Sequence, residues 1–196
     1  MNMQNSNLIN QMTVKNENAQ LAVFSCELKE VWEKSQKKFK IVTAESLTGG
    51  MIASAISMAP GSSRYFDRSF VVYNNEAKHE MLGINKKVFD QYTEVSGQCV
   101  MEMACGALDN SHADLAVSVS GVAGPDLGGD GHPVGTVWIG ACIKGRSPAC
   151  LCKHFAGNRE EIRLLTVDSA FNLLKNIILT EQYPSDYLLK EQFQDY

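Results

Sequence analysis

The chain has 196 residues, of which 44% are hydrophobic and 20% charged, enough apolar material for a buried core and too much for a disordered chain. Its 18 basic and 22 acidic side chains give a formal net charge of -4, which argues against a nucleic-acid partner. The polar N-terminus lacks an export signal, and the apolar runs are too short to span a membrane. We therefore expect a cytoplasmic protein without membrane or nucleic-acid partners, with a polar extension at 1–18, one domain at 19–180 and a tail at 181–196.

The cysteines and histidines are spaced unlike metal ligands or a disulfide framework. The 6 cysteines contain no CxxC pair, and the 4 histidines show no ligand spacing with one another or with the cysteines. The cysteines are Cys26, Cys99, Cys105, Cys142, Cys150 and Cys152. We expect free thiols, no metal and no cofactor.

The first two thirds of the chain alternate between helical and strand patterns. Apolar spacing and turn residues predict these elements in chain order: a helix at about 18–38, a strand at 40–44, a small-residue helix that ends at the turn 60–63, a strand at 68–74, helices at 75–82 and 96–110, and a strand at 114–120. Strands separated by helices favour a parallel sheet.

The last third adds a hairpin and a closing helix. Two apolar runs, 134–143 and 149–155, are joined by the short turn KGRSP, which is typical of antiparallel strands. A helix follows at about 158–178. The sequence therefore predicts an α/β fold: a three-layer α/β/α domain with a mixed sheet, made of parallel core strands plus an antiparallel hairpin.

Three unusual polar stretches directly follow the first three predicted strands. They are TAESLTGG at 43–50, VVYNNEAK at 71–78 and SVSGVAGP at 118–125. The carboxyl ends of parallel strands share one edge of a sheet, where open α/β folds bind their ligands. The three stretches are therefore expected to converge on one cleft.

The first stretch places a serine between a strand and a helix. Ser46 is followed by Thr48, Gly49 and Gly50, whose unobstructed backbone N–H groups could point at an anion or a developing oxyanion. The alternative is that Ser46 caps the helix while the glycines allow close packing. Residue spacing alone does not separate the two.

The second stretch places a lysine where helices favour acids. Tyr73 ends the strand, Asn74 or Asn75 can cap the next helix, and Lys78 lies in its first turn. A helix N-terminus and a desolvating cleft would both lower the pKa of Lys78, allowing it to accept a proton from a serine. The alternative is a solvated surface lysine. Asn75 is a candidate substrate-binding residue.

The third stretch is rich in small residues that let the backbone approach a phosphate or nucleotide closely. Its candidate substrate-binding residues are Ser120, Gly121 and Gly124. The alternative is a tight turn that requires glycine.

At these stretches the sequence resembles the CinA carboxy-terminal domain family over roughly residues 19–180. TAESLTGG is similar to the family's AESCTGG, and SVSGVAGPD followed by HPVGTVWI is similar to its S-[TS]-G-[IV]-AGPDGG and KPVGTVW. Between them, PGSSRYFDRSFVVYNNEAKHEMLGI and VSGQCVMEMACGA also resemble family motifs in the same order. Leu47, Leu127 and His132 depart from the family pattern.

The resemblance implies hydrolysis of the carboxamide of nicotinamide mononucleotide, a small-molecule substrate, to nicotinate mononucleotide and ammonia. It implies Ser46 as the nucleophile, Lys78 as the base and Tyr73 as an assisting group. It also implies a homo-oligomer. The alternative function is a nucleotide-binding protein linked to competence or DNA damage, with weak or no amidase activity. A third interpretation is hydrolysis of another amide by the same residues.

Overall fold

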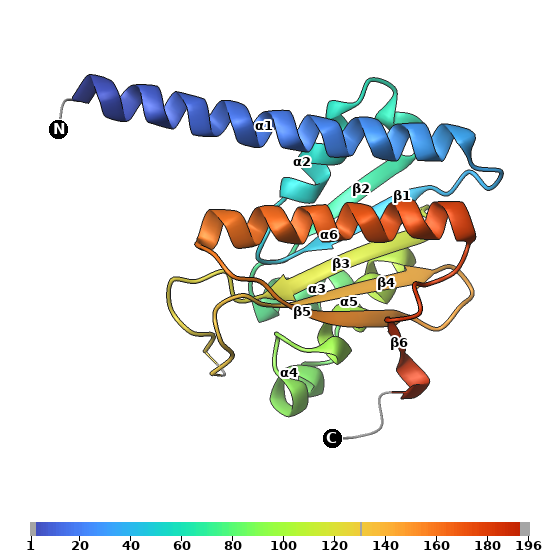
Figure 1. Ribbon diagram of the computed structural model, residues 1–196. Coiled ribbons are helices and arrows are strands. Elements are labelled where there is room, and N and C mark those ends of the chain that lie inside the picture. The colour runs from blue at the N-terminus through green and yellow to red at the C-terminus, as the bar shows by residue number, and fades with distance from the viewer. Residues whose placement is uncertain (1–2, 130, 193–196) are drawn as a thin grey trace.

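The computed structural model, which describes residues 3–129 and 131–192, contains a six-stranded mixed sheet in the order β2-β1-β3-β4-β5-β6 (Figure 1). The strands are β1 (Ile41–Glu45), β2 (Phe66–Val71), β3 (Leu115–Gly121), β4 (Thr136–Ile143), β5 (Ala149–His154) and β6 (Leu188–Leu189). Strand β1 pairs in parallel with β2 and β3, whereas β3, β4, β5 and β6 pair antiparallel in succession. The predicted mixed sheet is confirmed.

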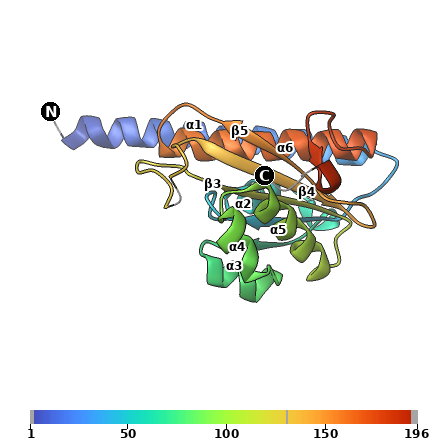
Figure 2. The same cartoon turned by 90° about the horizontal axis from the view of Figure 1, so that it is seen from below.

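Helices cover both faces of the sheet (Figure 2). One layer holds α1 (Met3–Lys34), α2 (Met51–Met58) and α6 (Arg159–Thr180). The other holds α3 (Asn75–Leu82), α4 (Lys86–Tyr92) and α5 (Gly97–Asp109). Two short 3-10 helices, η1 (Ser62–Arg64) and η2 (Lys190–Gln192), complete the described chain. The three-layer α/β/α prediction is confirmed.

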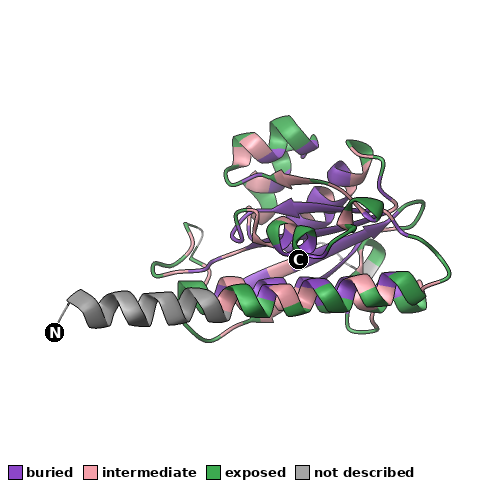
Figure 3. Ribbon diagram, turned by 90° about the horizontal axis from the view of Figure 1, so that it is seen from above, coloured by how far each residue is buried: buried purple, intermediate pink, exposed green. Residues whose placement is uncertain are grey.

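The central strands are buried because helices pack on both of their faces (Figure 3). Side chains alternate along each strand, so Ile41 and Val117 join the core beneath α1, α2 and α6, whereas Val42 and Ala116 join the core beneath α5. Within the described residues, no helix is long and apolar enough to cross a membrane.

The first helix differs from its predicted span at both ends. It begins at Met3, inside the segment expected to be a polar extension, and ends at Lys34 rather than near residue 38. The ammonium of Lys38 donates to the carbonyls of Trp32, Glu33 and Ser35, satisfying acceptors that the helix terminus leaves without partners. This side-chain cap explains the earlier end.

Two further elements were not predicted. Helix α4 is only 7 residues long and begins where the Asn85 side chain accepts the N–H of Lys87. Strand β6 lies in the segment expected to be a tail and pairs with β5. The Tyr183 hydroxyl holds this segment in place by donating to the Ser147 carbonyl and accepting the Ile143 N–H, both at 2.9 Å.

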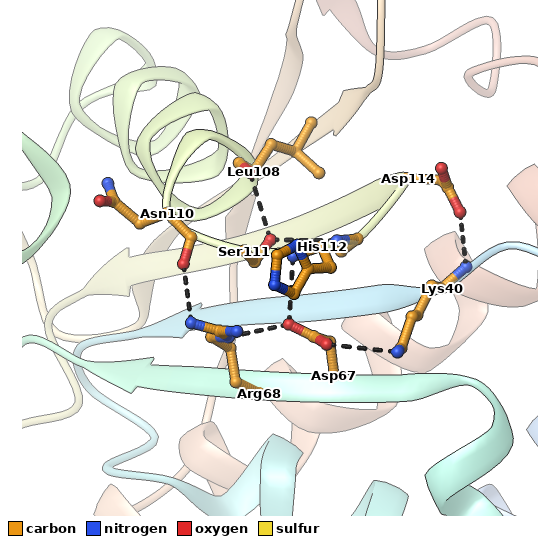
Figure 4. A network of polar contacts seen from close by, with 9 residues as sticks. Lys40, Asp67, Arg68, Leu108, Asn110, Ser111, His112 and Asp114 are labelled. Carbon is orange, nitrogen blue, oxygen red and sulfur yellow. Dashed lines mark hydrogen bonds and ion pairs between the residues drawn. The ribbon is translucent and has the colours of Figure 1, made fainter.

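A polar network joins the amino ends of the parallel strands (Figure 4). Asp67 accepts hydrogen bonds from the Arg68 guanidinium and the His112 N–H, and forms an ion pair with Lys40 at 3.4 Å. The Lys40 N–H in turn donates to Asp114. Partial burial alone would raise the pKa of Asp67, but these donors and cations outweigh it and lower the pKa below its usual value. The network stabilises the edge opposite the three polar stretches.

Candidate active site

The three polar stretches line one cavity at the carboxyl ends of β1, β2 and β3, as the parallel pairing predicts. Its volume is about 380 Å³, within the range of small-molecule sites. The residues that line it are Ser46, Leu47, Tyr73, Glu94, Val95, Ser120, Gly121, Val122, Ala123, Gly124, Pro125, Asp126, Gly128 and Arg159. The cavity contains one residue with a hydroxyl nucleophile beside a buried amine.

That pair is Ser46 and Lys78. The Lys78 Nζ lies 3.4 Å from the Ser46 Oγ, although 32 positions separate them in the chain. Only 1% of Lys78 and 8% of Ser46 is exposed, so the interpretation of Lys78 as a solvated surface lysine is wrong. The amine reaches the serine because Asn74 caps α3, accepting the Ala77 N–H at 2.8 Å, and starts the helix at the edge of the sheet.

Burial favours the neutral form of the Lys78 amine, the form that can accept a proton. Desolvation lowers its pKa from 10.5, whereas the nearby Cys99 and Glu94 act in the opposite direction. Among the described residues, no carboxylate lies within ion-pair distance of the Lys78 amine. The neutral amine that general-base chemistry needs is therefore favoured by its surroundings.

Glu45 organises the loop that carries the serine. Its carboxylate is fully buried and accepts the Thr48 hydroxyl at 2.8 Å. It also accepts three backbone N–H groups, from Gly50 at 3.1 Å, Ile52 at 3.0 Å and Ala53 at 2.8 Å. A carboxylate at a helix N-terminus is favoured by both the free N–H groups and the helix dipole. Glu45, not Ser46, therefore satisfies the start of α2.

This arrangement changes the expected roles of Gly49 and Gly50. The N–H of Gly49 donates to the Ser46 carbonyl at 3.0 Å, and that of Gly50 to Glu45, so both are already used inside the loop. Gly50 caps α2 with a φ of 96°, a conformation that favours glycine. These two glycines therefore shape the loop that follows Ser46.

Two other N–H groups of the loop remain available. Among the described residues, none accepts a hydrogen bond from the N–H of Leu47 or Thr48. The carbonyls of the same two residues accept the Arg163 guanidinium of α6 at 3.1 and 2.9 Å. Arg163 on one side and Glu45 on the other therefore hold the backbone that follows Ser46.

Tyr73 lies on the rim of the cavity. It is 61% exposed, and its hydroxyl accepts a hydrogen bond from Arg159 at 3.0 Å. Arg159 also donates to the Gly124 carbonyl at 2.7 Å, linking the second and third stretches. Asn75 is half-buried as the first residue of α3 and is not among the residues that line the cavity.

The third stretch combines packing demands with a place in the cavity wall. The Ser120 hydroxyl donates to the Glu94 carbonyl at 2.6 Å. A Cβ at Gly121 would lie 2.5 Å from the Thr136 carbonyl oxygen, so the close approach of β4 requires glycine there. Gly121 thus requires glycine because of strand packing rather than a tight turn, and it also lines the cavity.

Sequence reasoning missed Glu45, Arg159 and Arg163. A signal existed for Arg159, because a cation in the first turn of α6 is misplaced in the same way as Lys78 in α3. No comparable signal marks Arg163, whose role depends on how α6 packs against the loop after β1. Within the described chain, no three His, Cys, Asp or Glu side chains are grouped to hold a metal ion.

Comparisons with known proteins show the family of this chain. Residues 27–178 match the model of the CinA C-terminal domain family. The chain is 51% identical over 128 residues to the nicotinamide-nucleotide amidohydrolase PncC of Enterobacter agglomerans, covering 65% of this chain and 78% of that protein. It is 41% identical over 146 residues to a CinA-like protein of Endomicrobium trichonymphae, covering 74% of this chain but only 34% of that protein.

A solved structure is also similar. The competence damage-inducible protein A of Klebsiella pneumoniae superimposes with a TM-score of 0.77 at 31% sequence identity, covering 83% of this chain and 99% of that one. The match to the family model spans all of the residues that line the cavity. The chain belongs to the CinA C-terminal domain family.

Proposed function

We propose that the protein hydrolyses the carboxamide of nicotinamide mononucleotide to nicotinate mononucleotide and ammonia. The observation that supports this most is the 3.4 Å approach of the buried Lys78 amine to the hydroxyl of Ser46, which lines a cavity of small-molecule size. The relative from Enterobacter agglomerans carries the name of this activity.

In the first half-reaction the neutral Lys78 amine accepts the proton of the Ser46 hydroxyl, and Oγ attacks the carboxamide carbon. The oxyanion of the tetrahedral intermediate accepts hydrogen bonds from the N–H groups of Leu47 and Thr48, which have no other acceptor among the described residues. The Lys78 ammonium then returns the proton to the leaving nitrogen. The carbon–nitrogen bond breaks, ammonia leaves and an ester to Ser46 remains.

In the second half-reaction the same residues act on water. Lys78, again neutral, takes a proton from a water molecule that attacks the ester carbon. The ester bond breaks, Ser46 Oγ regains its proton from Lys78, and nicotinate mononucleotide is released. A base that must be neutral at the start of each half-reaction needs the lowered pKa that burial of Lys78 produces.

The phosphate of the substrate is assigned to Arg159. Of the residues that line the cavity, Arg159 alone carries a positive charge. Its guanidinium keeps further N–H donors beyond those given to Tyr73 and Gly124, and charge-assisted bonds to phosphate are strong. Tyr73 would then meet the substrate next to Arg159 as an assisting group.

Ammonia release tests the proposal. The purified protein is incubated in parallel with nicotinamide mononucleotide, nicotinamide and glutamine. We expect ammonia from the mononucleotide in amounts equal to the nicotinate mononucleotide formed, and none from the other two. Release from glutamine alone would indicate a different amidase. No release from any of them, together with binding of the mononucleotide, would favour the nucleotide-binding alternative.

Two expectations from the sequence stay predictions. The family resemblance implies a homo-oligomer, which light scattering of the purified protein would test. The cytoplasmic location predicted from the polar N-terminus would be tested by fractionation of the cells that produce the protein.

A further inference from the structure

A second cavity lies beside α5, in the helical layer that also holds α3 and α4. Its volume is about 420 Å³, and it is lined by α3, α4 and α5 together with Pro148 and Lys190. One of the side chains that line it is Cys105 of α5, which is half-buried. None of the residues that line the Ser46 cavity belongs to it.

A second thiol, that of Cys142, lies next to Cys105. The Sγ atoms of Cys105 and of Cys142 on β4 are 3.7 Å apart and form a thiol–thiol hydrogen bond, although 37 positions separate the two residues. Cys142 is buried, with 5% exposed, and unlike Cys105 it does not line the cavity. The pair thus has one sulfur that a small molecule can reach and one that it cannot.

We propose that Cys105 and Cys142 form a thiol pair that a hydroperoxide oxidises to an intramolecular disulfide. The sulfurs need to approach from 3.7 Å to the about 2.05 Å of a disulfide bond, a movement that side-chain rotation and a small shift of α5 can supply. The chemistry is independent of the proposed amidase function, since it uses neither Ser46 nor Lys78.

The oxidation proceeds in two balanced steps. The Cys105 thiolate attacks one oxygen of hydrogen peroxide, a sulfur–oxygen bond forms, the oxygen–oxygen bond breaks, and the departing hydroxide takes up the proton released by the thiol to become water. The Cys142 sulfur then displaces the hydroxyl group of the sulfenic acid. The disulfide forms, and that hydroxyl leaves as a second water with the proton of the Cys142 thiol.

The surroundings of the two sulfurs fit this order. The hydrogen bond with Cys142 and the charge of Lys190 lower the pKa of the Cys105 thiol, although burial, Asp109 and Glu102 act against them. The same contact and burial raise the pKa of Cys142. Burial also raises the pKa of Cys99 and of Cys150, each to about 12. Cys105 is therefore the member of the pair whose pKa is shifted toward the thiolate, the form that reacts with peroxides.

Mass spectrometry of the whole protein tests the proposal, in a Cys26→Ala background that removes the exposed cysteine and with it disulfides between molecules. After treatment with hydrogen peroxide we expect the loss of two hydrogen atoms, reversed by a thiol reductant. The bond must then be located. No Lys or Arg lies between Lys87 and Lys144, so trypsin leaves Cys105 and Cys142 in one peptide. A protease that cleaves after Asp and Glu separates them, and the disulfide joins the fragments.

Three single substitutions in that background complete the experiment. Cys142→Ala should leave the sulfenic acid of Cys105 without a partner, so that a dione reagent traps it, and Cys105→Ala should abolish both products. Cys150→Ala, a matched control at a buried thiol on the neighbouring strand β5, should form the disulfide normally. A disulfide that joins other cysteines, or peroxide-treated protein without the link between Cys105 and Cys142, would overturn the proposal even if every variant failed to fold.

Discussion

The two edges of the sheet give a lysine amine opposite electrostatic surroundings. At the amino edge Lys40 has a side chain that is 41% exposed and forms an ion pair with Asp67 at 3.4 Å. At the carboxyl edge Lys78 is 1% exposed and meets the Ser46 hydroxyl at 3.4 Å, with no ion pair among the described residues. The first arrangement favours charge, and the second disfavours it.

The pKa directions express the same difference. At the amino edge the pKa of Asp67 is lowered, which keeps its carboxylate charged beside its cations and stabilises the fold. At the carboxyl edge the pKa of Lys78 is also lowered, but for an amine this favours the neutral form and opposes folding while the amine carries its proton. The carboxyl edge therefore lowers the stability of the fold, whereas the amino edge raises it. Perturbed groups that lower stability are expected at active sites.

The largest expected effect follows from removing either member of the Ser46 and Lys78 pair. Ser46→Ala and Lys78→Met should each lower kcat by about 10²- to 10⁴-fold, because a nucleophile or its base is lost. The double variant should be little worse than the worse single variant, since the two act as one unit. Lys40→Met, the matched control at the amino edge, should keep normal turnover. Losses that multiply in the double variant would refute the serine–lysine mechanism.

Arg159→Ala should mainly affect the binding of the phosphate. We expect kcat/KM for nicotinamide mononucleotide to fall by about 10- to 100-fold, the cost of losing hydrogen bonds to a charged group. Nicotinamide riboside lacks the phosphate, so its already lower kcat/KM should hardly change. Steady-state kinetics with both substrates gives the comparison. An equal loss for both substrates would remove Arg159 from phosphate recognition.

Glu45→Gln should loosen the loop that carries Ser46 without removing a reacting group. The new amide has one acceptor oxygen and presents N–H donors toward the N–H groups of α2, so we expect the free energy of unfolding to fall by about 1–3 kcal/mol. kcat should fall as well, because the backbone next to Ser46 moves. Chemical denaturation and kinetics measure both quantities. Unchanged stability would show that the Glu45 carboxylate does not organise this loop.

The stability gained by Lys78→Met over wild type should increase as the pH falls. The folded-state pKa of Lys78 lies below its usual 10.5, so between these values the unfolded chain holds a proton that the folded chain lacks. Lys78 therefore destabilises the wild type increasingly as the pH falls from 10.5 toward the folded-state pKa. The gain in Tm of Lys78→Met over wild type should grow as the pH falls through that interval. It should be absent in Lys40→Met. A gain that is independent of pH would contradict burial as the cause.

The acidic limb of the wild-type pH profile for kcat/KM should reflect the protonation of Lys78. As the pH falls through the folded-state pKa of Lys78, the amine becomes protonated and kcat/KM should decline in proportion to the neutral fraction. Asp67→Asn should leave that limb unchanged, because Asp67 lies at the other edge. The smallest effect expected is on its stability, a loss of about 1 kcal/mol or less near neutral pH that disappears once Asp67 is protonated in the wild type. A shifted activity limb in Asp67→Asn would show that the two edges are coupled.

Local patterns in the sequence determined much of the fold and the position of the site. Alternating apolar runs and helix signals predicted the strands from β1 to β5 and helices α3, α5 and α6 to within a few residues, because side-chain periodicity and caps act over short distances. The parallel arrangement then placed Ser46 and Lys78 at one edge of the sheet. Short elements such as α4 and β6 were not predicted, since their formation depends on packing against the rest of the chain.

Only the tertiary structure decided which polar groups are free to act. Whether Lys78 is solvated or buried depends on the layer of α3 and α5, and whether the Gly49 and Gly50 N–H groups are free depends on how Glu45 turns beneath α2. Arg163 reaches the loop after β1 across 116 positions of the chain, and Cys105 meets Cys142 across 37. Such contacts carry no periodic signal, because desolvation and hydrogen-bond partners are set by segments that meet only when all three layers have assembled.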